Sequence, residues 1–66
     1  MIKNYNYERM NDHCIKIRYG INTIRIMAYY TKHIPKLELL ITSIDKRKPD
    51  LVSLLEKAKK NNLIIL

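Results

Sequence analysis

The chain has 66 residues, enough for one small domain and too few for a second hydrophobic core. It carries 13 Lys and Arg residues against 6 Asp and Glu residues, a formal net charge of +7. This excess favours a polyanionic partner, either nucleic acid or an acidic protein surface. Ile, Lys, Asn and Tyr make up about half of the chain, far above ordinary usage. Their A/T-rich codons indicate a low-GC genome, which would raise the Lys content without any selection for binding.

The sequence favours a cytoplasmic protein without disulfides. Cys14 is the only cysteine, so no internal disulfide can form. The first residues lack the apolar stretch of a secretory signal, and no segment approaches the ~20 consecutive apolar residues of a membrane span. A small core that no disulfide stabilises also predicts self-association, and we expect a homodimer.

Residues 1–12 are polar, and their structure is ambiguous. Tyr5, Asn6 and Tyr7 alternate as in a strand, but the stretch is too short to predict one. A flexible arm that becomes ordered on docking is one interpretation of these twelve residues.

The next segment, about 14–29, predicts a β-hairpin. Isoleucine and tyrosine alternate with basic and polar residues on both sides of Gly20, the only glycine. A two-residue loop of Gly20 and Ile21 would place Ile17 opposite Ile24, whereas a three-residue loop would mix the two faces. Glycine at the first central position also suits a type II′ turn. A four-residue loop preserves the same parity.

Two short helices are expected over about 35–47 and 49–61, each with one apolar stripe. Pro35 and Pro49 fit the first helical position, Asp50 complements the positive end of the second helix, and Asn61-Asn62 is a plausible stop. The apolar residues 63–66 should dock as a short C-terminal strand or extend as a tail. The expected fold is therefore a single α+β domain over 1–66, with the hairpin packed on the two helices.

No constellation of residues predicts an enzyme, a metal site or a cofactor. His13, Cys14 and His33 are the only soft metal ligands, and their spacing matches no zinc motif. The carboxylates are scattered, and one glycine cannot build a phosphate-binding loop.

One face of the hairpin is the main candidate site. The expected register places Lys16 opposite Arg25, and like charges across a ladder are destabilising unless the side chains splay into water or meet an anion. A basic two-stranded ribbon fits a DNA major groove. The candidate nucleic-acid-binding residues are Lys16, Arg18, Thr23, Arg25, Met27 and Tyr29. The alternative is a solvated outer face.

Residues 22–60 resemble ribbon-helix-helix regulators in the order of one strand and two short helices. The resemblance implies that Thr23, Arg25 and Met27 would face the major groove of a site bound by a dimer. The preceding strand over 14–19 and the carboxylate of Asp50 depart from that family's pattern, so membership is not inferred.

Leu39 lies opposite the apolar stripe of its helix and predicts an interface to a second copy or another protein. The apolar residues of the C-terminus join it as interface candidates: Leu63, Ile64, Ile65 and Leu66. The leading hypothesis is thus a small basic DNA-binding or nucleic-acid-binding protein that acts as a regulator. The alternative is a protein-interaction module, such as a phage or mobile-element inhibitor that docks on an acidic site of a host protein.

Overall fold

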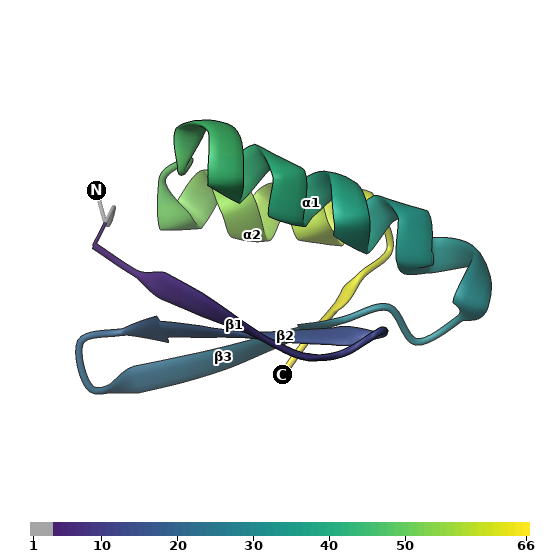
Figure 1. Ribbon diagram of the computed structural model, residues 1–66, viewed down its shortest axis with the longest axis horizontal. Coiled ribbons are helices and arrows are strands. Elements are labelled where there is room, and N and C mark those ends of the chain that lie inside the picture. The colour runs from purple at the N-terminus through teal and green to yellow at the C-terminus, as the bar shows by residue number, and fades with distance from the viewer. Residues whose placement is uncertain (1–3) are drawn as a thin grey trace.

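A computed structural model describes residues 4–66 and shows an antiparallel sheet covered on one face by two helices (Figure 1). The strands lie in the order β1-β2-β3-β4, so each strand pairs with its neighbour in the sequence. The α+β fold is as expected. Within residues 4–66, no helix is long and apolar enough to cross a membrane. The elements are β1 (Asn6–Asn11), β2 (Cys14–Tyr19), β3 (Asn22–Met27), a 3-10 turn (Thr31–His33), α1 (Ile34–Arg47), α2 (Leu51–Lys60) and β4 (Ile64–Ile65).

The register of the β2–β3 hairpin is the predicted one. Ile17 lies opposite Ile24, and Gly20 and Ile21 form the two-residue loop. Gly20 has a φ of +59°, and Ile21 is not among the residues with positive φ. This combination fits a type II′ turn, in which only the first central residue needs positive φ. Ile21 is fully exposed at the tip of the turn.

β1 lies within residues 1–12, the stretch for which a flexible arm was one interpretation. Asn6–Asn11 pairs with β2 along that strand, with an irregularity between Arg9 and Asn11. Tyr5, just before the strand, is fully buried, and Arg9 forms an ion pair with Glu38 of α1, so side-chain contacts join β1 to the helical layer. Neither contact produces the alternation of apolar residues from which a strand can be predicted. The first three residues of the expected arm lie outside the described part of the chain.

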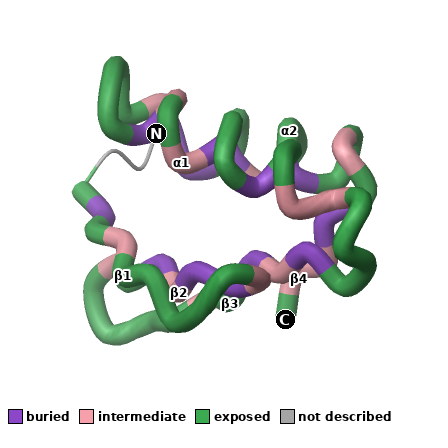
Figure 2. The backbone as a smooth tube through the Cα atoms, turned by 45° about the vertical axis from the view of Figure 1, so that its right-hand side comes forward, coloured by how far each residue is buried: buried purple, intermediate pink, exposed green. Residues whose placement is uncertain are grey.

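The core lies between the sheet and the helices (Figure 2). Both helices begin and end within two residues of their expected bounds, and each turns its predicted stripe inward. The buried apolar side chains come from every layer: Tyr5, Ile15, Ile17, Ile26, Ala28, Leu37, Leu40, Ile44, Leu51, Leu54, Ala58 and Leu63.

The C-terminal residues are tied back by the end of α2. Asn62 adopts a φ of +63°, and its N–H donates to the Lys59 carbonyl at 3.1 Å. The Leu63 N–H donates to the Ala58 carbonyl at 2.9 Å. This pair of bonds is a Schellman motif, and it directs the chain into β4 beside β3. The predicted short C-terminal strand is therefore present, with Ile65 opposite Ile26.

Candidate nucleic-acid interface

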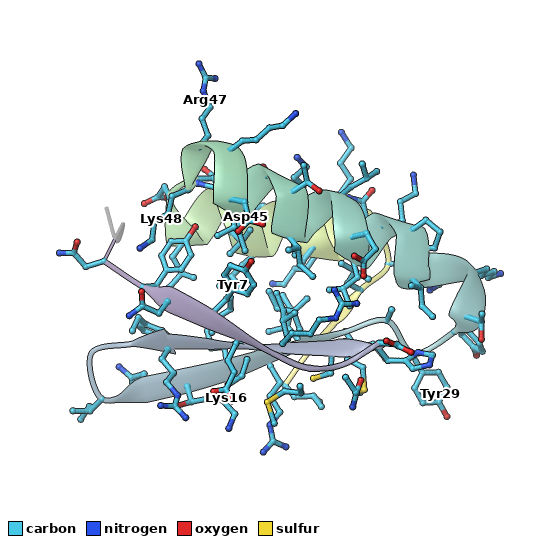
Figure 3. All side chains as sticks on the ribbon, in the orientation of Figure 1. Tyr7, Lys16, Tyr29, Asp45, Arg47 and Lys48 are labelled. Carbon is cyan, nitrogen blue, oxygen red and sulfur yellow. The ribbon has the colours of Figure 1, made fainter. Side chains whose placement is uncertain are left out.

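The two helices leave the opposite face of the sheet uncovered, and we call this the outer face. Because side chains alternate along a strand, the inward position of Ile15, Ile17 and Ile26 places their neighbours on the outer face. Lys16 projects there, away from the helices (Figure 3). The candidate residues of the hairpin share this face: Lys16 and Arg18 from β2, and Thr23, Arg25 and Met27 from β3.

The predicted juxtaposition of like charges is present in the structure. Lys16 lies opposite Arg25, and Arg18 lies opposite Thr23. Arg18 and Arg25 are exposed, while Lys16 is partly covered at the centre of the sheet. The outer face therefore holds three cations on two neighbouring strands.

A carboxylate that the sequence interpretation missed moderates this charge. Glu8 of β1 lies opposite Lys16, and its Oε1 is 3.6 Å from Nη2 of Arg18. Both side chains of that ion pair remain more than half exposed, so the pair is heavily screened by solvent. Glu8 could not be assigned from the sequence because β1 itself was not recognised.

The hairpin differs from a free two-stranded ribbon. β1 pairs along β2 on one side, and β4 pairs with the end of β3 on the other. Neighbouring strands are about 4.8 Å apart, so three strand axes span about 10 Å before side chains are added. A major groove about 12 Å wide admits a helix or two strands. The outer face is therefore a broad surface rather than an element that enters a groove.

The end of the outer face distant from Gly20 is apolar. The alternation of side chains along β1 places Met10 on the outer face. Met27 lies opposite Ile64, and Leu66 exchanges backbone hydrogen bonds with Arg25. Met10 and Leu66 are 44% and 65% exposed. Apolar side chains thus border the cations on one surface, with Leu66 directly beside Arg25.

Tyr29 and Tyr30 form an aromatic corner just beyond β3. Their ring centroids are 5.1 Å apart with the planes perpendicular, and the Tyr30 ring contacts His33 edge-on at 5.7 Å. The Lys32 ammonium lies 5.8 Å from the centroid of the Tyr30 ring. Tyr29 projects to the same side of the sheet as Lys16 (Figure 3).

The helical layer presents further basic side chains. Lys46, Arg47 and Lys48 gather at the end of α1, and Lys57, Lys59 and Lys60 at the end of α2. They are exposed, and their charge complements the negative end of each helix dipole. Arg47 points away from the sheet in Figure 3. Lys48 instead turns to the Tyr5 ring. The positive charge of the molecule is therefore not confined to the outer face.

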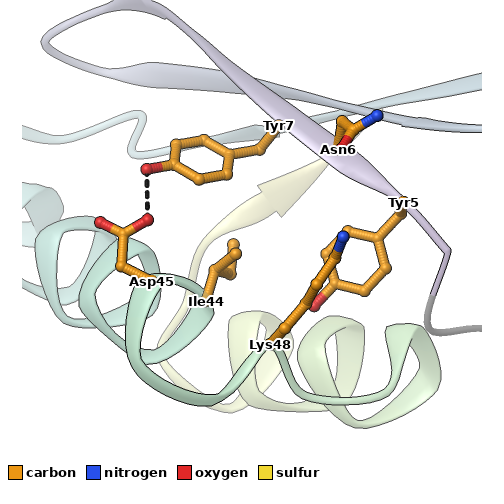
Figure 4. A pocket seen from close by; sticks show the side chains of 6 residues that line it. All are labelled: Tyr5, Asn6, Tyr7, Ile44, Asp45 and Lys48. Carbon is orange, nitrogen blue, oxygen red and sulfur yellow. Dashed lines mark hydrogen bonds between the residues drawn. The ribbon is translucent and has the colours of Figure 1, made fainter.

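A shallow pocket opens where β1 meets the end of α1 (Figure 4). Its volume is about 310 Å³. Tyr7 donates a 2.6 Å hydrogen bond to Asp45 across the pocket, and this bond is the main reason that the pKa of Tyr7 is raised. Tyr5 donates to the Pro49 carbonyl. Its pKa is raised by burial and, to a smaller extent, by Asp50. The pocket residues are Tyr5, Asn6, Tyr7, Ile44, Asp45 and Lys48.

The residues predicted as a protein interface fall into different environments. Leu39 is exposed on α1, and Leu66 is exposed after β4. Ile64 and Ile65 are partly buried in β4, and Leu63 lies in the core of its own chain. Leu63 is therefore occupied by intramolecular packing.

The soft metal ligands are not clustered. Cys14 is buried, with its thiol 3.6 Å from the Ile15 carbonyl, and the His13 ring contacts the Ala28 carbonyl. Within residues 4–66, no three His, Cys, Asp or Glu side chains gather as a metal-binding group.

Comparisons with known protein families, with curated proteins and with solved structures give no match to this chain.

Proposed function

We propose that this protein binds nucleic acid on the outer face of its sheet. The observation that carries the proposal is the position of Lys16 opposite Arg25, with Arg18 on the same uncovered surface. A like-charge pair across a ladder costs about 0.2–1 kcal/mol in the free protein. A phosphate placed between the two side chains would convert this repulsion into two favourable contacts.

The use of the acidic side chains supports the same proposal. Glu38 pairs with Arg9, and Asp45 accepts the Tyr7 hydroxyl. Asp50 is 7% exposed and sits at the start of α2. Glu38 and Asp45 are thus engaged by other side chains, and the Asp50 carboxylate is buried without a hydrogen-bond partner, whereas most Lys and Arg side chains that the structure describes extend into solvent. The outward charge is therefore more positive than composition alone conveys.

The function is one of binding, in the cytoplasm, and the protein acts as a regulator through occupancy of its ligand. DNA and RNA both offer the phosphate backbone that the outer face would contact. Phosphate contacts position a protein without reading sequence.

Fluorescence anisotropy with labelled single-stranded and duplex oligonucleotides at about 50 and 200 mM salt tests the proposal. Affinity should fall steeply with salt, because each phosphate contact releases counterions. Failure of every oligonucleotide to bind at the lower salt concentration would overturn the proposed function.

A pair of variants with equal charge locates the binding surface. Lys16→Gln combined with Arg25→Gln should weaken binding and make the logarithmic salt slope shallower by roughly one to two. Lys57→Gln combined with Lys59→Gln removes the same charge from α2 and should have a much smaller effect. Equal losses from the two pairs would show that net charge, and not the outer face, drives binding.

Two further substitutions separate binding from folding. Glu8→Gln should tighten oligonucleotide binding because it removes the one outer-face carboxylate opposite Lys16.

Arg25→Thr should weaken binding while it stabilises the free protein by up to about 1 kcal/mol, because the like-charge pair disappears. Weaker binding together with higher stability would not be expected if Arg25 served only the fold.

The second candidate function is docking on an acidic host protein, as a phage or mobile-element inhibitor would do. The apolar side chains beside the cations of the outer face favour it, because Met and Arg are enriched at protein interfaces. Met10→Ser with Leu66→Ser should abolish such docking but leave oligonucleotide affinity unchanged. Loss of both activities in this variant would place the two ligands on one shared surface.

A further inference from the structure

We infer that the nucleic acid bound by this protein is single-stranded and that its bases stack on the aromatic corner of Tyr29 and Tyr30. This inference rests on the proposed function and adds the class of ligand and the residues that contact its bases. Three observations support it: the exposure of the two rings, the alignment of Tyr29 with Arg25 along one strand direction, and the breadth of the sheet.

The two rings are exposed yet held in place. Tyr29 and Tyr30 are 63% and 57% exposed, which leaves most of two large apolar rings in water. The perpendicular contact between them and the contact of Tyr30 with His33 restrain both rings. Restrained, accessible rings are the platforms on which unpaired bases stack, and every base has a π-face to offer. A core tyrosine such as Tyr5 could not serve in this way.

The corner lies in line with Arg25, the one cation of β3. Arg25, Met27 and Tyr29 occupy alternate positions, and the Ala28 N–H continues the ladder by donating to the His13 carbonyl at 2.7 Å. At about 3.3 Å per residue, Arg25 and Tyr29 are roughly 13 Å apart along the strand. A strand whose phosphates contact Lys16 and Arg25 would therefore reach the corner a few nucleotides later. Lys32 supplies a further cation beside Tyr30.

A duplex fits this surface poorly. Its bases are stacked on each other and closed to aromatic side chains, and the four-stranded sheet offers no narrow element for the major groove. An unpaired strand exposes phosphates and base faces together, which matches the arrangement of cations and rings on the outer face.

The test uses three labelled probes of equal length, about twelve nucleotides. They are a thymine single strand, an abasic single strand with the same phosphates, and a duplex. Anisotropy at about 50 mM salt gives the affinities. The variants are Tyr29→Leu with Tyr30→Leu, which removes the rings, and Tyr29→Phe with Tyr30→Phe, which keeps them. Urea unfolding of both confirms that each is folded.

The wild-type protein should bind the thymine strand at least about fivefold more tightly than the abasic strand, as expected for one stacked base. The leucine variant should lose that preference, and the phenylalanine variant should keep it. Because the chain has five Tyr and no Trp, quenching of tyrosine fluorescence by the thymine strand and not by the abasic strand gives a direct reading of stacking.

Three outcomes would overturn the inference. Equal affinity for the thymine and abasic strands, or unchanged binding by the leucine variant, would exclude stacking but leave phosphate binding on the outer face intact. Tighter binding of the duplex than of the thymine strand would exclude the single-stranded ligand. Failure of all three probes to bind would instead remove the proposed function itself.

Discussion

At the scale of single residues, Lys48 holds a backbone conformation that its side chain disfavours. It ends α1 with a φ of +43°, and its N–H donates to the Ile44 carbonyl at 2.9 Å. Glycine is the usual residue at this position, because a Cβ in the left-handed region costs about 1 kcal/mol or more. The Lys48 ammonium lies 5.1 Å from the centroid of the Tyr5 ring, which offsets part of that cost.

Lys48→Gly should therefore stabilise the protein, by up to about 1 kcal/mol after the loss of the contact with Tyr5. Urea unfolding followed by circular dichroism measures the change. Lys46→Gly is the control, because Lys46 lies within the last turn of α1 and glycine there should destabilise by about 0.5–1 kcal/mol. A loss of stability in both variants would mean that the Lys48 side chain contributes more than its backbone costs.

Tyr5 links the stability of the fold to alkaline pH. Burial, with a smaller effect of Asp50, raises its pKa above the ordinary value of 10.0. The unfolded chain therefore releases this proton first as pH rises, so the free energy of unfolding should fall from about pH 10 upward. The decline should continue until the folded Tyr5 ionises.

Tyr5→Phe should make this alkaline decline shallower, although it also removes the hydrogen bond to the Pro49 carbonyl. Urea unfolding at intervals between pH 8 and about pH 11 gives the profile. Tyr29→Phe is the matched control, because it removes the hydroxyl of an exposed tyrosine. Identical slopes for wild type and Tyr5→Phe would assign the decline to other groups, among them Tyr7, whose pKa is raised by its bond to Asp45.

At the scale of elements, the spacing of apolar residues and the even number of residues in the hairpin loop determined what the sequence could predict. The β2–β3 register followed because only an even loop places Ile17 opposite Ile24, and a one-residue slip would turn every isoleucine to solvent. The helices followed from their apolar stripes. β1 could not be predicted, because its inward residues are Tyr7 and the charged Arg9. Its order depends on partners in α1 that are distant in sequence.

The residues of the candidate site were likewise predictable only in part. Lys16, Arg18 and Arg25 were predictable because the hairpin register fixes their shared face. Glu8 and Met10 belong to β1 and were missed with it. The breadth of the surface also depends on β1 and β4. Because of this breadth, the expected ligand is a single strand and not the major groove of a duplex.

The C-terminal element separates two leucines that look alike in the sequence. Leu63 is buried beside Ala58, whereas Leu66 is exposed. Leu63→Ala should destabilise the protein by about 2–5 kcal/mol, and Leu66→Ala should change stability by less than about 0.5 kcal/mol. Thermal or urea unfolding of the two variants compares them directly. Similar losses would mean that Leu66 is also buried in solution, for example in a dimer.

At the scale of the whole molecule, one chain closes its own core. The apolar side chains of both helices and of the inner sheet face are covered within the described residues. The exposed apolar residues are dispersed, with Leu39 on α1, Val52 on α2, and Met10 and Leu66 on the outer face. The predicted homodimer would therefore depend on a small contact, and Leu39, at 58% exposed, is its expected centre.

Such a dimer and the proposed binding of nucleic acid should respond to salt in opposite directions. Two copies that meet through α1 bring like-charged helices together, so dimerisation should strengthen as salt screens the repulsion. Oligonucleotide binding should weaken over the same range. Sedimentation equilibrium at about 50 and 500 mM salt measures the first effect. Leu39→Lys should yield a monomer at both salt concentrations, while Val52→Lys, a matched change on α2, should leave the dimer intact. A wild-type monomer at every salt and protein concentration tested would exclude the dimer, and the fold would then depend on its single core alone.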